Sequence, residues 1–231
     1  MSDLLSADGA ARTCAPIHYR HAYLVSALAA MICLPPFFPS RVLGLALIEG
    51  LLFLALLAGV YSTAADRRRS ALATSLALVA LAARLVWDEG ETGASFFVFL
   101  ASYLAFFTLV GVTLLTRLFR PGQLVSADTL CGAASVYLIL GVVGTCAYAL
   151  LESAVPGSFT FAQEAPLAEE RFERFLGFSF ATLTTLGYGN VSPATPRADA
   201  LATAQAVAGQ FYVAVVVARF VALQLAQGRE R

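Results

Sequence analysis

The chain has 231 residues, of which 59% are hydrophobic and 13% are charged, and its mean hydropathy is +0.76. Soluble domains carry about twice that charged fraction, so the composition excludes a water-soluble protein and predicts a membrane protein. The 15 basic residues, all of them arginine, balance 15 acidic residues. A net charge of zero lacks the basic surface that nucleic-acid binding requires, so no nucleic-acid partner is expected.

The residues that hold metals in proteins are few and poorly spaced. His18 and His21 lie three positions apart without a third ligand nearby, and no two of the four cysteines form a C-x-x-C pair. We therefore expect no structural or catalytic metal centre, no disulfide framework and no organic cofactor. The chain also lacks a nucleophile and base in the arrangement typical of enzymes, so no enzymatic activity is expected.

Residues 1–20 are polar and are expected to form a short N-terminal arm. The first apolar run, 22–34, ends at Pro35 and reaches spanning length only if its helix starts near Ile17. A cleaved signal peptide is the alternative for this run, but no small-x-small site follows it and the arm contains acidic residues. Five longer apolar stretches each predict a membrane-spanning helix: 42–61, 71–87, 95–116, 132–151 and 200–226.

Charges near the ends of these six stretches predict their orientation, because short arginine-rich segments stay in the cytoplasm. With both termini inside, arginines outnumber acidic residues in the cytoplasmic segments, and acidic residues outnumber arginines in the external ones. The sequence therefore predicts six spans with both termini cytoplasmic.

Residues 152–199 form neither a simple loop nor a full span. Their part 172–184 is mostly apolar, long enough for a helix that enters the membrane and too short for one that crosses it. Residues 185–189 then read Thr-Leu-Gly-Tyr-Gly. Irregular backbone at membrane depth is tolerated where it lines a water-filled path, and glycines permit the angles that turn successive carbonyls toward one axis. We expect these carbonyl oxygens to face a dehydrated cation.

The run from Thr182 to Asn190, with Pro193 three positions later, resembles the signature of tetrameric pore-loop potassium channels, whose filter is made of four T-V-G-Y-G loops. The resemblance covers residues 130–226. It implies an all-α integral membrane fold of six transmembrane helices, with a re-entrant pore helix and selectivity filter between the fifth and sixth. An incidental glycine-rich turn is the alternative, but the half-helix, filter, proline and flanking spans occur in the family's order.

The resemblance further implies a homotetramer that conducts K+ passively, with membrane lipid as its surroundings and a bacterial cytoplasmic membrane as its location. It divides the chain into a cytoplasmic arm (1–20), a four-helix transmembrane module (21–120), a cytoplasmic linker (121–131), a pore domain (132–226) and a C-terminal tail (227–231). The fourth predicted span carries no charge. Because voltage sensing requires charges that move through the membrane field, weak or absent voltage gating is expected.

Residue roles also follow from the resemblance. Four filter residues would bind K+ through their carbonyl oxygens, and the threonine also through its hydroxyl: Thr185, Leu186, Gly187 and Tyr188. Four neighbours would support the filter: Thr182, Thr184, Gly189 and Asn190. The inner helix would have a gating hinge followed by a cavity wall and inner gate: Gly209, then Val213, Val217 and Val221. Close helix packing is the alternative for the glycine, and a lipid-facing stripe is the alternative for the valines.

Several positions depart from the family's pattern. Leu186 replaces the usual Val or Ile, and Asn190 replaces the usual Asp. Gly177 and Phe178 stand where many voltage-gated members carry a Trp pair, and neither has a side-chain donor that could hold Tyr188 from behind. We therefore expect a filter that is less tightly braced and inactivates readily.

Three ionisable residues fall inside the predicted spans, namely Glu49, Arg84 and Arg219. A charge that faces lipid is costly, so Glu49 and Arg84 are expected to pair and stabilise the bundle. A proton- or ligand-sensing role is the alternative for this pair. Arg219 is expected near the cytoplasmic surface, where Asp128 is a candidate partner.

Two other functions fit parts of this pattern. A nonconducting or weakly selective membrane sensor or scaffold could keep the pore fold, and a transporter could use broken helices around a site at the membrane midplane. The transporter is disfavoured because the sequence has a single re-entrant segment and no second half that mirrors it.

Overall fold

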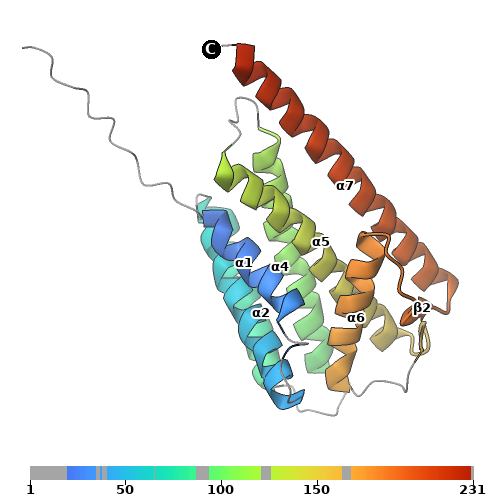
Figure 1. The fold of residues 1–231 in the computed structure, drawn as a ribbon. Coiled ribbons are helices and arrows are strands. Elements are labelled where there is room, and N and C mark those ends of the chain that lie inside the picture. The colour runs from blue at the N-terminus through green and yellow to red at the C-terminus, as the bar shows by residue number, and fades with distance from the viewer. Residues whose placement is uncertain are drawn as a thin grey trace, which may run out of the picture.

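The computed structural model describes residues 20–34, 37, 41–64, 66–86, 94–120, 126–162 and 168–229. Nearly all of the expected N-terminal arm and the end of the tail lie outside this part of the chain. Within it, helices and two short strands follow in this order (Figure 1): α1 (Arg20–Cys33), α2 (Arg41–Thr63), α3 (Arg67–Val86), α4 (Ala94–Leu118), α5 (Ala127–Ala154), β1 (Phe159–Phe161), α6 (Ala168–Leu183), β2 (Val191–Pro193) and α7 (Pro196–Arg229).

α4 and α5 form the centre of the bundle, with α1, α2 and α3 on one side and α6 and α7 on the other (Figure 1). The buried side of α4 is aromatic, and the rings of Phe106 and Phe107, both fully buried, meet edge to face with their centroids 5.2 Å apart. Large apolar side chains also cover the outer surface, among them Leu54, Leu78 and Leu85. Apolar residues on both the inside and the outside of a bundle suit lipid surroundings.

The helix lengths confirm four of the expected spans. Among the described residues, four helices are long and apolar enough to cross a membrane: 67–86, 94–118, 127–154 and 196–225. The described part of α1 has 14 residues and is about 21 Å long, short of the ~30 Å hydrocarbon core. Residues 17–19, on which the expected first span depends, lie outside the described residues, so that span stays a prediction. α2 has 23 residues, of which the described part Leu47–Thr63 is apolar, so the second expected span also stays a prediction.

α5 and α7 begin earlier than their apolar stretches because polar residues cap them. Ser126 is the N-cap of α5, and its hydroxyl accepts a hydrogen bond from the Thr129 backbone N–H at 3.2 Å. The expected linker 121–131 is therefore shorter, since α5 already includes its last residues. Thr195 similarly accepts from the Ala198 N–H at 3.3 Å, and Pro196 opens α7.

The chain between α5 and α7 leaves one end of the bundle and returns to it (Figure 1). β1, which follows α5, pairs antiparallel with β2, which precedes α7, in the register Thr160 to Ser192. α6 therefore starts and the segment after it finishes at the same end. Glu152 at the end of α5 orders this turn, because its carboxylate accepts from the N–H groups of Gly157 and Phe159, both at 3.0 Å.

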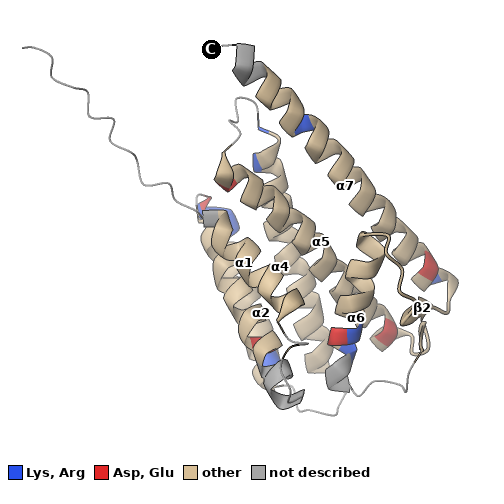
Figure 2. Ribbon diagram, in the orientation of Figure 1, with Lys and Arg blue, Asp and Glu red and all other residues tan. Residues whose placement is uncertain are grey.

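Figure 2 shows that the charged residues lie near the two ends of the bundle, whereas its middle is almost free of them. One end of the bundle holds the C-terminal ends of α2 and α4. There the Arg117 guanidinium donates to the Ser62 carbonyl at 2.8 Å, and the Arg69 guanidinium donates to the Thr116 hydroxyl at 3.3 Å. Arginines thus tie the helix ends together at one face of the bundle.

Arg219 on α7 also lies at this end, where it binds backbone. Its Nε donates to the Leu118 carbonyl at 3.0 Å and its Nη2 donates to the Arg120 carbonyl at 2.9 Å. The expected partner was wrong: Asp128 accepts from the His21 backbone N–H at 3.1 Å. The last carbonyls of a helix have no intrahelical partner and carry partial negative charge, which explains why the end of α4 attracts the guanidinium.

Arg84 on α3 and Glu49 on α2 form the expected ion pair. The two side chains are 25% and 53% exposed respectively, so the pair lies at the outer surface of the bundle. Its partners come from neighbouring helices, and each removes the cost of leaving the other charge unpaired beside lipid.

Removal of one charge should therefore destabilise the protein more than removal of both. We expect Glu49→Gln and Arg84→Met each to lower the free energy of unfolding by about 1–3 kcal/mol. The double variant should recover most of that loss, because no isolated charge remains. Unfolding by SDS titration in mixed micelles measures this. Additive losses in the double variant would contradict the pairing.

Candidate functional site

α6 is fixed by an aromatic cluster between its inner face and the turn after α5. Phe175 is fully buried, and its ring lies 5.0 Å from that of Phe159 and 6.4 Å from that of Tyr148, centroid to centroid. Phe178 adds a further contact, with its ring 4.9 Å from Tyr148. The cluster joins α5, β1 and α6, so it holds the half-length helix at a fixed depth along the bundle.

The segment that follows α6 folds back onto the helix end through one carbonyl. The Ala181 oxygen accepts from the N–H of Leu186 at 2.8 Å and from that of Gly187 at 3.2 Å. In a planar trans peptide the N–H points opposite to the carbonyl of the preceding residue. The carbonyls of Thr185 and Leu186 therefore both point away from α6, to the same side.

The sign of the backbone angle φ alternates along this segment. Positive φ occurs at Thr185 (59°), Gly187 (63°) and Gly189 (78°), and not at the two residues between them. In an ordinary strand successive carbonyls point to opposite sides. Left-handed residues at every second position turn them toward one side instead, and glycine adopts the left-handed angle without a steric penalty.

Thr185 adopts this left-handed angle although it is β-branched, which costs conformational energy. Its N–H donates to the Thr182 carbonyl at 3.0 Å, and its hydroxyl donates to the Thr184 carbonyl at 2.7 Å. The Thr184 hydroxyl in turn donates to the Phe180 carbonyl at 2.7 Å. The threonines predicted as filter and support residues thus form the turn between α6 and residues 185–189, which we call the carbonyl segment.

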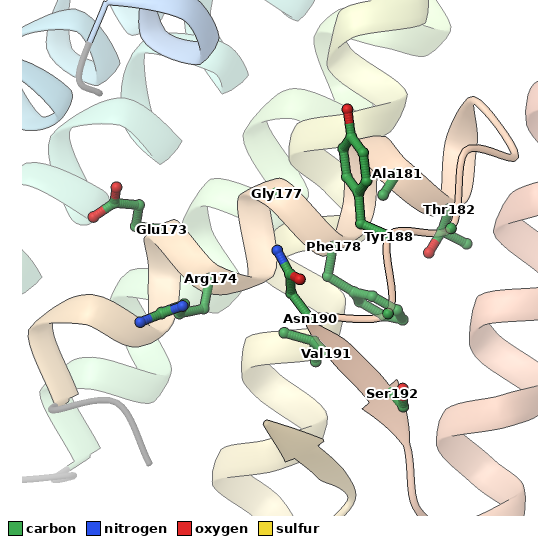
Figure 3. A pocket seen from close by; sticks show the side chains of 12 residues that line it. Glu173, Arg174, Gly177, Phe178, Ala181, Thr182, Tyr188, Asn190, Val191 and Ser192 are labelled. Carbon is green, nitrogen blue, oxygen red and sulfur yellow. The ribbon is translucent and has the colours of Figure 1, made fainter. Parts of the chain in front are cut away.

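Residues 184–190 are exposed in the single chain. Behind them lies a hollow of about 600 Å³, lined by α6 and by the returning segment (Figure 3). Tyr188 stands beside Ala181 and Asn190 lies near Gly177 (Figure 3). Phe178 packs within the aromatic cluster, tilted against the ring of Tyr148.

Gly209 on α7 packs against Leu183 at the end of α6. A Cβ atom at this position would lie 2.5 Å from the Leu183 carbonyl oxygen and 2.8 Å from its Cδ1. Only glycine fits this contact without a shift. The packing alternative for Gly209 therefore has a direct structural basis, while its role as a hinge stays a prediction.

The remaining inner-helix residues lie on an open surface of α7. Val213, Val217 and Val221 are 44%, 56% and 54% exposed in the single chain. Their lining of a cavity stays a prediction, since lipid could also cover them. α7 is continuous from Pro196 to Arg229, and Tyr212 fastens it to α5 by donating to the Ala133 carbonyl at 2.6 Å.

One group of residues at this site was missed from the sequence. Gln205 on α7, Ser179 on α6 and Tyr148 on α5 are joined by hydrogen bonds directly behind α6. Two of them are fully buried. A glutamine in the first half of a predicted span was a signal that could have indicated such a network, since polar side chains in membrane helices often bond to neighbouring helices.

A family model described as an ion channel matches residues 135–224, less than half of the chain. The matched part includes most of α5, all of α6, the carbonyl segment and most of α7. No curated protein matches the chain. The match supports an ion channel, a transport protein rather than an enzyme, and the apolar helices support a membrane-embedded one.

Proposed function

We propose that this protein is a potassium-selective channel that conducts K+ passively through a filter formed by residues 185–189 of four identical chains. The observation that carries the proposal is the double acceptance at the Ala181 carbonyl. It turns the carbonyls of Thr185 and Leu186 to one side, and the positive φ angles at Gly187 and Gly189 would let the carbonyls of Gly187 and Tyr188 follow the same arrangement. Rings of backbone carbonyls that replace the hydration shell are how potassium filters bind their ion.

A homotetramer is proposed because one chain supplies only one side of such a ring. The carbonyl segment and much of α7 are exposed in the single chain, including Phe211 at 68% and Leu225 at 66%. Assembly about the carbonyl segment would bring four copies of it around one axis. The remaining apolar surface of the bundle would face lipid.

We further propose that the arginine-rich end of the bundle faces the cytoplasm, so that both termini lie inside. α4 carries no charged residue before Arg117, which lies in its last turn. With no charge in α4 that could move through the field, the four-helix module would give weak or absent voltage dependence. Residues 21–120 would then serve assembly or regulation by another stimulus.

Reconstitution of the purified protein into planar bilayers tests the function. With K+ on one side and Na+ on the other, the reversal potential should lie close to the value for K+, and Ba2+ should block the current. The conductance should vary little with voltage at fixed gradients. A protein that inserts as a tetramer and passes no current would favour the sensor or scaffold alternative, and equal K+ and Na+ permeability would refute the proposed selectivity.

A further inference from the structure

A hydrogen-bond network joins α5, α6 and α7 behind the carbonyl segment. The Tyr148 hydroxyl donates to the Gln205 Oε1. The Gln205 Nε2 donates to the Ser179 hydroxyl at 2.7 Å and to the Leu140 carbonyl at 3.4 Å. The Ser179 hydroxyl then donates to the Gly141 carbonyl at 2.6 Å. Gln205 thus links α7 to α6 through Ser179 and to α5 through Tyr148 and the Leu140 carbonyl.

Each polar atom of the network has one consistent role. The amide oxygen of Gln205 accepts, both hydrogens of its nitrogen are donated, and Ser179 accepts one bond and donates another. Ser179 and Tyr148 are both 0% exposed. A buried network with every donor used holds its side chains in one arrangement, and loss of one member leaves the others unsatisfied.

Two glycines of α5 leave room for this arrangement. A Cβ atom at Gly144 would lie 2.1 Å from the Gln205 Nε2 and 2.6 Å from the Ser179 hydroxyl. A Cβ atom at Gly141 would lie 2.2 Å from the Phe180 ring. The three helices therefore approach one another closely enough for a single glutamine to reach both neighbours of α7.

The network reaches Ser179, two residues before Ala181, whose carbonyl oxygen holds the carbonyl segment. Ser179 belongs to the last turns of α6, and the Ala181 oxygen accepts from Leu186 and Gly187. Behind the segment, Gly177 and Phe178 offer no donor. Polar contacts from outside α6 hold this helix end: Gln205 and the Gly141 carbonyl bind Ser179, and the Tyr137 hydroxyl donates to the Leu183 carbonyl at 3.4 Å.

We infer that Gln205 is a positioning residue for the carbonyl segment. It fixes the end of α6 relative to α7 and α5, and thereby fixes the Ala181 oxygen and the carbonyls of residues 185 and 186. It acts through Ser179 and Tyr148 and does not touch the ion. A movement of α7 would reach the segment through this glutamine. The inference deepens the proposed function and rests on it for its effect on selectivity.

Gln205→Leu, Ser179→Ala and Tyr148→Phe remove the network one member at a time. Matched controls are Gln224→Leu, an exposed glutamine on α7, and Ser153→Ala, whose hydroxyl bonds within α5 to the Ala149 carbonyl at 2.7 Å. Hydrogen exchange of the full-length protein in nanodiscs should be about tenfold faster in residues 184–190 of the network variants. Exchange in the α4 core, residues 99–107, should stay at the wild-type rate in every variant. In the two control variants, exchange in residues 184–190 should also match the wild type.

The K+ to Na+ permeability ratio is measured on the same proteins. We expect it to fall severalfold in Gln205→Leu and to keep the wild-type value in Gln224→Leu. If Gln205→Leu does not assemble, Tyr148→Phe removes a single hydroxyl and gives the same test. Unchanged exchange in residues 184–190 overturns the inference, as does faster exchange throughout the protein. A wild-type protein that passes no K+ would refute the proposed function, and the exchange rates would still decide whether Gln205 positions the segment.

Discussion

Gly187→Ala is expected to abolish potassium-selective current. Gly187 has φ of 63°, and an alanine in this left-handed region costs about 1–2 kcal/mol per chain. The relief of that strain rotates the peptide between Leu186 and Gly187, which turns the Leu186 carbonyl out of line and breaks the bond from the Gly187 N–H to the Ala181 oxygen. In a tetramer this cost occurs four times. Bilayer recordings at symmetrical and bi-ionic conditions measure the loss.

The matched control for this prediction is Gly157→Ala. Gly157 has φ of 83° and, like Gly187, has open space where a Cβ atom would be added. The two substitutions therefore carry the same backbone penalty, one inside the carbonyl segment and one in the turn before β1. We expect Gly157→Ala to conduct and select as wild type does. Equal loss of current in both variants would show that general destabilisation, rather than carbonyl orientation, is responsible.

Gly209→Ala is expected to destabilise the protein by about 1–3 kcal/mol. The added methyl would lie 2.5 Å from the Leu183 carbonyl oxygen, a backbone atom at the end of α6 that cannot rotate away as a side chain would. α7 must then move away from α6, which weakens the contact between the two helices beside the carbonyl segment. Thermal unfolding of the detergent-solubilised protein measures the change in stability.

Gly50→Ala provides the comparison, because Gly50 lies within α2 and an added Cβ atom would meet nothing within 4 Å. Alanine is the better helix former by roughly 0.5–1 kcal/mol, so this variant should be as stable as wild type or slightly more stable. The pair also separates the two interpretations of Gly209. If Gly209 is a hinge, Gly209→Ala should change the open probability of the channel and be as stable as Gly50→Ala. If Gly209 serves packing, Gly209→Ala should be less stable than Gly50→Ala.

Much of the site could be predicted from the sequence because its signals are local. The threonine-rich half-helix, the two glycines of the segment and Pro193 lie within about twenty consecutive positions, and the structure places the helix end at Leu183, one residue from the expected position. The Glu49 and Arg84 pair was also predictable, since two opposite charges at similar depth in neighbouring spans have few other partners. Helix starts were less predictable because Ser126 and Thr195 extend helices beyond the apolar residues.

Contacts between distant parts of the chain could not be predicted in the same way. Arg219 reaches the last carbonyls of α4, about one hundred positions earlier, because the tilt of α7 brings it there. Nothing in a run of apolar residues gives that tilt. Gln205 was passed over for the same reason: its partners, Ser179 and Tyr148, become neighbours only after three helices pack.

The sequence by itself determined a membrane protein with a half-length helix and a carbonyl segment, since composition, helix length and glycine angles are properties of short stretches. The tertiary structure alone decided what holds that segment. It placed the Leu183 carbonyl against Gly209 and brought Gln205 behind α6. These features depend on how each helix is rotated and tilted against its neighbours, and that arrangement is set by the packing of the whole bundle.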